Sequence, residues 1–431
     1  MQAIVIRGGR EARGEVDLSG SKNASLAILA AAMLAEDVSV IENVPDIADV
    51  RTMINVLESL GCKCSFKDGA VTVDARNLTS FEAPYHLVKR MRASFYAAGP
   101  LLARLGIARV PLPGGCVLGS RPVNFHIDGF EALGAKVDLD RGCVEARAER
   151  LKGAFIYLDP RFCSVGATVN IAMAASLAEG TTVIENAAKE PEVQEFCRVL
   201  NKMGAKVEGI GTGRLIIHGR RRLHGFRHKV MNDRIEAGTY LLAAPLTGGE
   251  VKVGPIDPSF LELPLKKLAE AGVEVERGPD WIRARARGRP KGIHIVTLPY
   301  PGFPTDLHPP FVAMMAVAEG ASVVRETIYE GRWGYVDELR RMGARITVED
   351  KVAVIEGVGR LKGAPVEAPD IRAGAALVLA GLNAEGETVI TGIEHIDRGY
   401  ERIEEKFASL GVDIERLEVT EGEPCSASTL G

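Results

Sequence analysis

Cys116 lies in the stretch PLPGGCVLGSRPVNFH, residues 111–126, where it stands between glycines and five residues ahead of Arg121. A glycine-rich stretch of this kind predicts an exposed loop that can move, and such a loop offers a cysteine little apolar core to pack against. Because a nearby cation lowers the pKa of a thiol, Arg121 could bring Cys116 into the range of proton transfer. The pattern therefore favours a chemical role for Cys116 over a structural one.

Six other segments each begin with polar or charged residues and continue as an alanine-rich apolar run. Runs that are apolar on nearly every face are typical of buried helices. Serine and aspartate cap the N–H groups at a helix start, whereas basic side chains oppose the positive end of the helix dipole. The basic residues at these starts therefore indicate a site for an anionic ligand. The six segments begin at Lys22, Arg92, Ser164, Arg234, Asp306 and Arg372.

An internal repeat of about 70 residues predicts the elements that position these residues. In each copy a helix-like segment ends in a glycine and an alternating apolar strand follows, as in FEALGAKVDL and LRRMGARITV. The glycine fits a left-handed helix C-cap, where a Cβ atom would be strained. Six α/β modules fill the chain, and they favour two domains of three modules over a tandem solenoid. The repeated glycines are Gly61, Gly134, Gly204, Gly272, Gly343 and Gly411.

The composition narrows the class of protein. A chain of 431 residues exceeds one ordinary core, and its 46% apolar and 26% charged residues are typical of a soluble globular protein. A net charge of −4 favours neither a nucleic-acid nor a membrane-surface partner. The opening MQAIVIRGG reads as a strand rather than a signal peptide. Seven scattered cysteines favour a reducing cytoplasm over a disulfide framework, and we expect no metal site.

Eight stretches, found in order along nearly the whole chain, resemble the enolpyruvyl transferases that act on UDP-N-acetylglucosamine, also called 1-carboxyvinyltransferases. Four of them are SGSKNA (19–24), SVGATVNI (164–171), FPTDL (303–307) and HIDRGYERIEEK (395–406). The resemblance implies an α/β fold of two domains, each an inside-out barrel of three βαβαββ repeats around buried helices. The first domain would span 22–231 and carry the cysteine loop. The second would combine 1–21 with 232–431, and the active site would lie in the cleft between them.

The resemblance further implies the reaction and the residues that perform it. The enolpyruvyl group of phosphoenolpyruvate would pass to the 3′-hydroxyl of UDP-N-acetylglucosamine with release of phosphate, as the first committed step of bacterial peptidoglycan synthesis, without a cofactor. Cys116 matches the general acid that protonates C3 of phosphoenolpyruvate, and Asp306 matches a residue near the transferred hydroxyl. Lys22 and Arg398 are also implied to be catalytic. The implied phosphoenolpyruvate-binding residues are Lys22, Asn23, Arg121 and Arg398.

The resemblance also implies a lining for the sugar nucleotide and a set of supporting residues. The lining comprises Asn23, Arg92, Arg121, Pro122, Val123, Asn124, Phe125, His126, Ser164, Val165, Gly166, Asp306 and Ile328. The residues expected to support domain closure are Asp233, Arg234, Glu236, Asp370 and Arg372. The chain departs from the family pattern at His308, where glutamine is frequent, and at Phe162, where some relatives have lysine. It departs again at Gly331 and Trp333, within a common Glu-Asn-Arg-Phe motif.

Other functions stay open at the level of sequence. A 3-phosphoshikimate enolpyruvyl transferase would typically carry Lys-Ser where this chain has Lys22-Asn23, and it would lack the cysteine loop. An enolpyruvyl transferase for another nucleotide, or a catalytically silent sugar-nucleotide-binding homologue, is also compatible with the fold. A hydrolase that pairs Cys116 with His126 would need a third, orienting group, and the sequence shows no signature of one.

Overall fold

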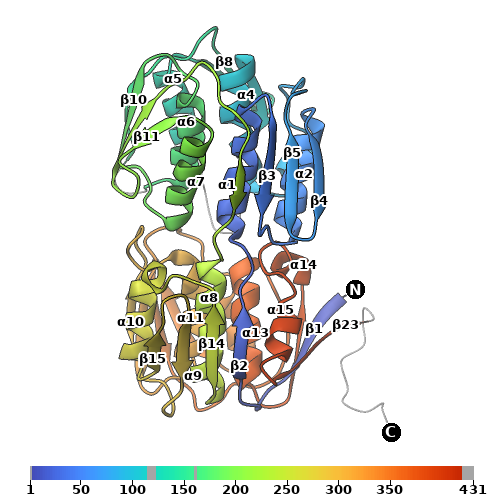
Figure 1. The fold of residues 1–431 in the computed structure, drawn as a ribbon. Coiled ribbons are helices and arrows are strands. Elements are labelled where there is room, and N and C mark those ends of the chain that lie inside the picture. The colour runs from blue at the N-terminus through green and yellow to red at the C-terminus, as the bar shows by residue number, and fades with distance from the viewer. Residues whose placement is uncertain (1, 114–122, 160–162, 420–431) are drawn as a thin grey trace.

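The computed structural model describes residues 2–113, 123–159 and 163–419, which form two lobes stacked end to end (Figure 1). Each lobe has its own hydrophobic core. Residues between 24 and 230 build the core of the first lobe, and residues 4–18 together with 235–414 build the core of the second. The chain crosses between the lobes twice, and the crossings lie side by side: Gly20 pairs with Asn232 in an antiparallel bridge, and the Ser21 amide donates to the Met231 carbonyl at 2.7 Å.

The first lobe surrounds its helices with three small sheets, which are formed by alternating apolar strands. One sheet has the order β13 (Arg227–Lys229), β3 (Val38–Glu42), β5 (Ala70–Asp74) and β4 (Lys63–Lys67). The next has the order β6 (Ile107–Pro111), β8 (Cys143–Arg147) and β7 (Lys136–Asp140). The last has the order β11 (Lys206–Glu208), β12 (Arg214–His218), β10 (Thr181–Glu185) and β9 (Phe155–Tyr157). The α-helices are α1 (Lys22–Ala31), α2 (Ala48–Ser59), α3 (Tyr85–Val88), α4 (Ala98–Leu105), α5 (Asn124–Ala132), α6 (Val165–Ala175) and α7 (Pro191–Lys202).

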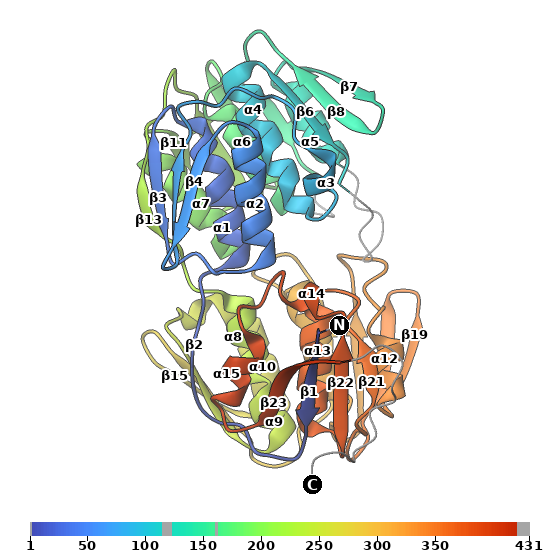
Figure 2. The ribbon, with the colours of Figure 1, turned by 90° about the vertical axis from the view of Figure 1, so that its right-hand side faces the viewer.

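The second lobe repeats this plan and includes the N-terminal strands (Figure 2). One sheet has the order β21 (Pro365–Glu367), β22 (Glu387–Thr391), β1 (Gln2–Arg7) and β23 (Asp413–Glu418). Another has the order β15 (Glu274–Arg277), β16 (Ile282–Arg285), β14 (Glu250–Gly254) and β2 (Arg13–Asp17). A further sheet has the order β17 (His294–Val296), β18 (Ala321–Arg325), β20 (Val352–Glu356) and β19 (Arg345–Glu349). The α-helices are α8 (Arg234–Leu241), α9 (Ala243–Thr247), α10 (Glu262–Glu270), α11 (His308–Met315), α12 (Val336–Arg341), α13 (Ile371–Asn383), α14 (Ile393–Ile396) and α15 (Ile403–Ala408).

The alanine-rich runs form the buried central helices, as predicted from their composition. In α13 every residue from Arg372 to Leu382 is buried, and α13 packs against α11. In the first lobe α4 packs against α6 so closely that a Cβ atom on Gly99 would lie 2.5 Å from the Asn170 carbonyl oxygen. Two of the runs open with a short 3-10 turn instead of an α-helix, at Arg92–Ala97 and at Thr305–Leu307.

The glycines of the repeat end their helices in the predicted conformation. All six have a positive φ, from 83° at Gly411 to 107° at Gly61, which a side chain with a Cβ atom adopts only with strain. The α/β class and the repeated unit are thus confirmed.

Within the described residues, no helix has both the length and the apolar character needed to cross a bilayer.

Candidate active site

Lys22 lies at the first position of α1, where the chain enters the first lobe. The Ser21 hydroxyl caps the helix by accepting a hydrogen bond from the Ala24 amide at 3.3 Å. The Lys22 amide donates to Asp233 Oδ2 at 3.0 Å, so a carboxylate of the second lobe holds the start of this helix. The Lys22 side chain is buried and its Nζ lies 2.8 Å from Asp49 Oδ2.

Asp49 joins Lys22 to the second lobe. It lies in the first turn of α2, its side chain is 3% exposed, and its Oδ1 accepts a hydrogen bond from Arg398 Nε at 2.9 Å. Burial by itself would raise the pKa of Asp49, but the charges of Lys22 and Arg398 outweigh it and hold the pKa below its ordinary value. Burial lowers the pKa of Lys22, and Asp49 partly offsets this effect. Lys22 and Arg398 therefore share one carboxylate at the junction of the lobes.

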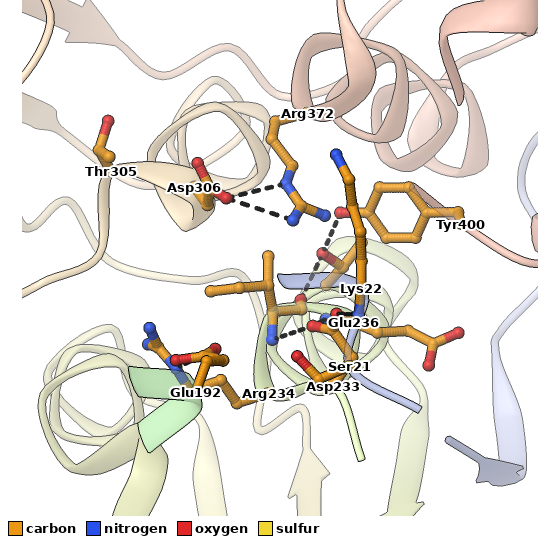
Figure 3. Close-up of polar contacts among 12 residues, drawn as sticks. Ser21, Lys22, Glu192, Asp233, Arg234, Glu236, Thr305, Asp306, Arg372 and Tyr400 are labelled. Carbon is orange, nitrogen blue, oxygen red and sulfur yellow. Dashed lines mark hydrogen bonds and ion pairs between the residues drawn. The ribbon is translucent and has the colours of Figure 1, made fainter. Parts of the chain in front are cut away.

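Asp306 lies between two arginines of the second lobe. Its Oδ2 accepts from Arg372 Nε and NH2 at 3.3 and 3.2 Å, and its Oδ1 lies 2.9 Å from Arg332 NH1 (Figure 3 draws the contacts with Arg372). Burial would raise the pKa of Asp306, but Arg372 and Arg332 hold it well below its ordinary value. Among the described residues, Arg332 Nε and Arg372 NH1 are buried without a hydrogen-bond partner. Unpaired guanidinium donors beside a carboxylate are suited to bind an anionic ligand.

Helix caps and a stacked ring fix the positions of these charges. Asp370 caps α13 by accepting from the amides of Arg372 and Ala373 at 2.8 and 3.0 Å. The Arg372 guanidinium lies over the Tyr400 ring, 5.2 Å from its centroid. Figure 3 shows Lys22, Arg372 and Tyr400 converging from different parts of the fold. The positive charge of Arg372 also contributes to the lowered pKa of Lys22, so the two cationic groups act on each other.

Asp233, Arg234 and Glu236, which are also expected to support domain closure, form hydrogen bonds at the two places where the chain crosses between the lobes. Asp233 caps α8 through the amides of Ile235 and Glu236, at 2.8 and 3.0 Å. Arg234 Nε donates to Glu192 of the first lobe at 2.9 Å, and both side chains are buried. Glu236 accepts from Lys406 Nζ and from the Ser19 amide of the other crossing, at 2.6 and 2.7 Å.

A second group of predicted residues gathers around His126 in the first lobe. Asn170 Nδ2 donates to the Phe95 carbonyl at 2.9 Å and lies 3.0 Å from His126 Nδ1, which places the imidazole proton on Nε2. Burial, together with the charge of Arg92, lowers the pKa of His126 to about 3. His126 Nε2 lies close to Gly166, where a Cβ atom would be 3.2 Å away. The neutral imidazole thus directs a donor toward the start of α6, which Ser164 caps.

Of the other predicted residues, Cys116, Arg121, Pro122 and Phe162 fall outside the part of the chain that the structure describes. The rest are located by their position in the helices and by their burial. Asn23 and Asn124 are exposed at the starts of α1 and α5, Phe125 is half-buried in α5, Val123 is buried, and Val165 begins α6. The Ile328 amide donates to Glu326 at 2.7 Å.

The sequence predictions missed Asp49, Arg332 and Glu326. An aspartate in the first turn of an amphipathic helix is ordinary capping chemistry, so no local signal sets Asp49 apart. Arg332 could have been found, because this chain retains the arginine of the Glu-Asn-Arg-Phe motif while two neighbouring positions change.

Comparisons with known proteins place this geometry in context. The family model described as EPSP synthase (3-phosphoshikimate 1-carboxyvinyltransferase) matches residues 6–407. A protein of Caldanaerobacter subterraneus subsp. tengcongensis named UDP-N-acetylglucosamine 1-carboxyvinyltransferase 3 is 49% identical over 417 residues, and one of Carboxydothermus hydrogenoformans named UDP-N-acetylglucosamine 1-carboxyvinyltransferase 2 is 51% identical over 419 residues. Each alignment covers 97% of this chain and 100% of the relative.

Two solved structures share the fold. The enolpyruvyl transferase NikO from Streptomyces tendae matches with a TM-score of 0.87 at 27% identity, covering 96% of this chain and 98% of that one. An EPSP synthase from Acinetobacter baumannii matches with a TM-score of 0.73 at 20% identity, covering 97% of this chain and 100% of that one. The second likeness bears on the fold alone.

Proposed function

Because the chain belongs to the EPSP synthase family of enolpyruvyl transferases, and within it to the UDP-N-acetylglucosamine 1-carboxyvinyltransferases, we propose that it transfers the enolpyruvyl group of phosphoenolpyruvate to the 3′-hydroxyl of UDP-N-acetylglucosamine. The reaction releases inorganic phosphate. It would serve as the first committed step of peptidoglycan synthesis in a bacterial cytoplasm, and hence cell-wall biogenesis, cell shape and division.

Besides membership of the family, one structural observation supports the proposal. Two ion clusters lie at the junction of the lobes, and in each of them a single carboxylate contacts two cationic side chains. Asp49 links Lys22 with Arg398, and Asp306 links Arg332 with Arg372. A substrate with a phosphate and a carboxylate needs several cations held in fixed directions, and guanidinium groups bind both anions through paired hydrogen bonds.

The chemistry is an addition followed by an elimination. A proton is added to the CH2 carbon of phosphoenolpyruvate while the sugar hydroxyl oxygen adds to its C2 carbon and loses its own proton. Removal of a proton from the resulting methyl group then restores the double bond as the C–O bond to phosphate breaks. Fixed positive charge assists the second step, because phosphate leaves as an anion.

We assign Lys22 and Arg398 to the phosphate and carboxylate of phosphoenolpyruvate, with Arg121 as a further cation and Cys116 as the acid. Asp306 is held ionised by two arginines, and its low pKa makes it a poor acceptor for a fully transferred proton. We therefore assign Asp306 to orienting the sugar hydroxyl as a hydrogen-bond acceptor. Asn23, Arg92 and the residues from Pro122 to His126, with Ser164 to Gly166 and Ile328, are assigned to the sugar nucleotide.

We also propose the domain limits 22–231 and 1–21 with 232–431. The two separate hydrophobic cores support them, as does the bridge between Gly20 and Asn232 at the crossings. The supporting residues Asp233, Arg234 and Glu236 lie at this hinge, so we assign them to the relative placement of the domains.

Phosphate release from phosphoenolpyruvate tests the function directly. We expect release that requires UDP-N-acetylglucosamine and is not sustained by shikimate 3-phosphate. We further expect Cys116→Ala to lose most of the activity while its circular dichroism spectrum and melting temperature stay close to those of the unmodified protein. Equal turnover with shikimate 3-phosphate, or none with the sugar nucleotide, would refute the proposed substrate, and an undiminished rate in Cys116→Ala would remove the acid role.

A further inference from the structure

Glu326 forms a buried polar centre behind Asp306. It directly follows β18, and both Glu326 and His308 have fully buried side chains. Its Oε1 accepts from the Thr297 hydroxyl at 2.8 Å and from the amides of Ile328 and Tyr329 at 2.7 and 3.0 Å. One carboxylate oxygen thus holds the backbone of the segment that includes Ile328, which we assign to the sugar-nucleotide site.

The other oxygen of Glu326 reaches the residues around Asp306. Glu326 Oε2 accepts from the Thr305 hydroxyl at 2.8 Å and lies 3.0 Å from His308 Nδ1. The Thr305 hydroxyl in turn accepts from Arg332 NH1 at 2.8 Å, and the same nitrogen lies 2.9 Å from Asp306 Oδ1. A continuous set of hydrogen bonds therefore runs from Glu326 through Thr305 and Arg332 to Asp306.

The protonation states in this cluster are mutually consistent. Burial alone would raise the pKa of Glu326, but hydrogen bonds from His308, Thr305 and the Tyr329 amide hold it below its ordinary value, so the carboxylate is ionised and only accepts. Burial lowers the pKa of His308 and favours the neutral ring. His308 then donates from Nδ1 to Glu326, and Nε2 accepts from the Tyr335 hydroxyl at 2.7 Å. This single tautomer satisfies both ring nitrogens of His308.

We propose that Glu326 is a positioning residue for the transfer reaction, which fixes Asp306 and Arg332 through the Thr305 hydroxyl and fixes Ile328 through its backbone amide. The inference rests on the proposed function, because the two segments that Glu326 joins are those assigned to the reacting hydroxyl and to the sugar nucleotide. Glu326 itself is buried behind these residues and acts through them.

Two of the positions at which the chain departs from the family pattern, His308 and Trp333, lie in this cluster. His308 replaces a frequent glutamine, and the Trp333 ring packs edge-on against His308 with 4.7 Å between centroids. The Tyr335 hydroxyl completes the contacts of the same imidazole. Histidine therefore supplies the Nδ1 donor that holds Glu326, and glutamine at 308 could supply an equivalent donor from its amide. The cluster preserves the donor to Glu326 with a different side chain.

Matched substitutions at residue 305 isolate the connection between Glu326 and Asp306. Thr305→Val keeps the shape and removes the hydroxyl, whereas Thr305→Ser keeps the hydroxyl. With UDP-N-acetylglucosamine as acceptor, we expect kcat to fall at least tenfold in Thr305→Val, equivalent to about 1.4 kcal/mol of transition-state stabilisation. Thr305→Ser should retain kcat within about threefold, since its hydroxyl can still bond both Glu326 and Arg332.

Substitution of Glu326 itself should affect both the segment that contains Asp306 and the segment that contains Ile328. Glu326→Gln should lower kcat at least tenfold and should speed amide hydrogen exchange at Ile328 and Tyr329 in the substrate-free protein, because their N–H groups lose a charged acceptor. His308→Gln should keep kcat within about threefold, and His308→Leu should lose about as much as Glu326→Gln. Glu330→Gln is the control, because Glu330 lies in the same segment with an 80% exposed side chain and pairs with Lys351 at the surface.

These measurements separate this inference from the proposed function. Wild-type rates with UDP-N-acetylglucosamine decide the function, whereas amide exchange in the substrate-free variants reports on Glu326 without any turnover. Unchanged kcat and unchanged exchange in Thr305→Val and Glu326→Gln would overturn the positioning role. So would a lowered melting temperature with wild-type kcat, which is the result expected of a purely structural residue. If Glu326→Gln does not fold, the comparison of Thr305→Val with Thr305→Ser decides the question alone.

Discussion

Substitution of Asp49 is the most specific test of whether the two lobes together position the cationic side chains that we assign to phosphoenolpyruvate. Asp49→Asn keeps the size of the side chain and removes the charge that lies 2.8 Å from Lys22 Nζ and 2.9 Å from Arg398 Nε. Removing one member of a buried ion pair typically costs about 3 to 5 kcal/mol, because the partner stays buried without compensation. Arg398 is 31% exposed and asparagine keeps one acceptor oxygen, so we expect the lower end of this range.

A loss of about 3 kcal/mol in transition-state stabilisation, because the two cations are no longer held in place, corresponds to roughly 160-fold at 1.36 kcal/mol for each factor of ten. We expect kcat/KM for phosphoenolpyruvate to fall by about this factor, whereas KM for UDP-N-acetylglucosamine should change less than about threefold. The same substitution should move the alkaline limb of the pH profile. Burial lowers the pKa of Lys22 and Asp49 raises it, so without Asp49 the protonated amine is lost at a lower pH.

Steady-state phosphate release at varied phosphoenolpyruvate, measured from pH 6 to pH 10, gives both quantities. Asp46→Asn is the matched control, since Asp46 lies just before α2, close to Asp49 in the chain, but pairs with Arg51 at the surface, where both side chains are 53% exposed. Exposed pairs of this kind contribute about 0 to 1 kcal/mol, so the control should behave as the unmodified protein. If Asp49→Asn has the same kcat/KM and the same alkaline limb as Asp46→Asn, Asp49 does not organise Lys22 and Arg398.

Two further predictions concern Asp306 and the crossings. Asp306→Asn should lower kcat about 100-fold, because the hydroxyl loses its charged acceptor and Arg332 and Arg372 lose their partner. Since two arginines hold the pKa of Asp306 well below its ordinary value, kcat of the unmodified enzyme should show no acidic limb from this group between pH 5 and 8; a limb abolished by Asp306→Asn would make Asp306 a true base. Gly20→Ala would place a Cβ atom 1.7 Å from the Asn43 carbonyl oxygen, so we expect a loss of about 1 to 3 kcal/mol in thermal or urea unfolding. Gly213→Ala, with no atom of the described residues within 4 Å, is the control, and equal stability of the two variants would contradict the close approach at the crossing.

Most of the fold could be predicted from the internal repeat and from the glycines that end its helices. A glycine at each helix end and an alternating strand after it are local features, and they define the α/β unit without knowledge of distant contacts. Lys22 was likewise recognisable, because a basic residue at the start of an apolar helix opposes the helix dipole and differs from ordinary capping. Asp306 was identified mainly through the resemblance, because an aspartate at such a position is ordinary capping chemistry. Asp49 was not, since its role depends on Arg398, which lies 349 positions away in the chain and reaches it only when the lobes meet. Glu326 was missed for the same reason, because an acid directly after a strand shows its partners only when residues 297, 305 and 308 have folded around it.

The pairing of β1 has a consequence for the order in which the protein is made. β1 lies between β22 and β23, and Ile4 faces Ile390 on one side and Arg416 on the other. β1 is therefore synthesised roughly 20 to 80 s before its partner β23, at rates of about 5 to 20 residues per second. The first lobe, whose core is built from one continuous segment, can fold during this interval. Meanwhile the apolar QAIVIR strand remains without partners on either edge, and an unpaired strand of this kind is a template for association with other chains.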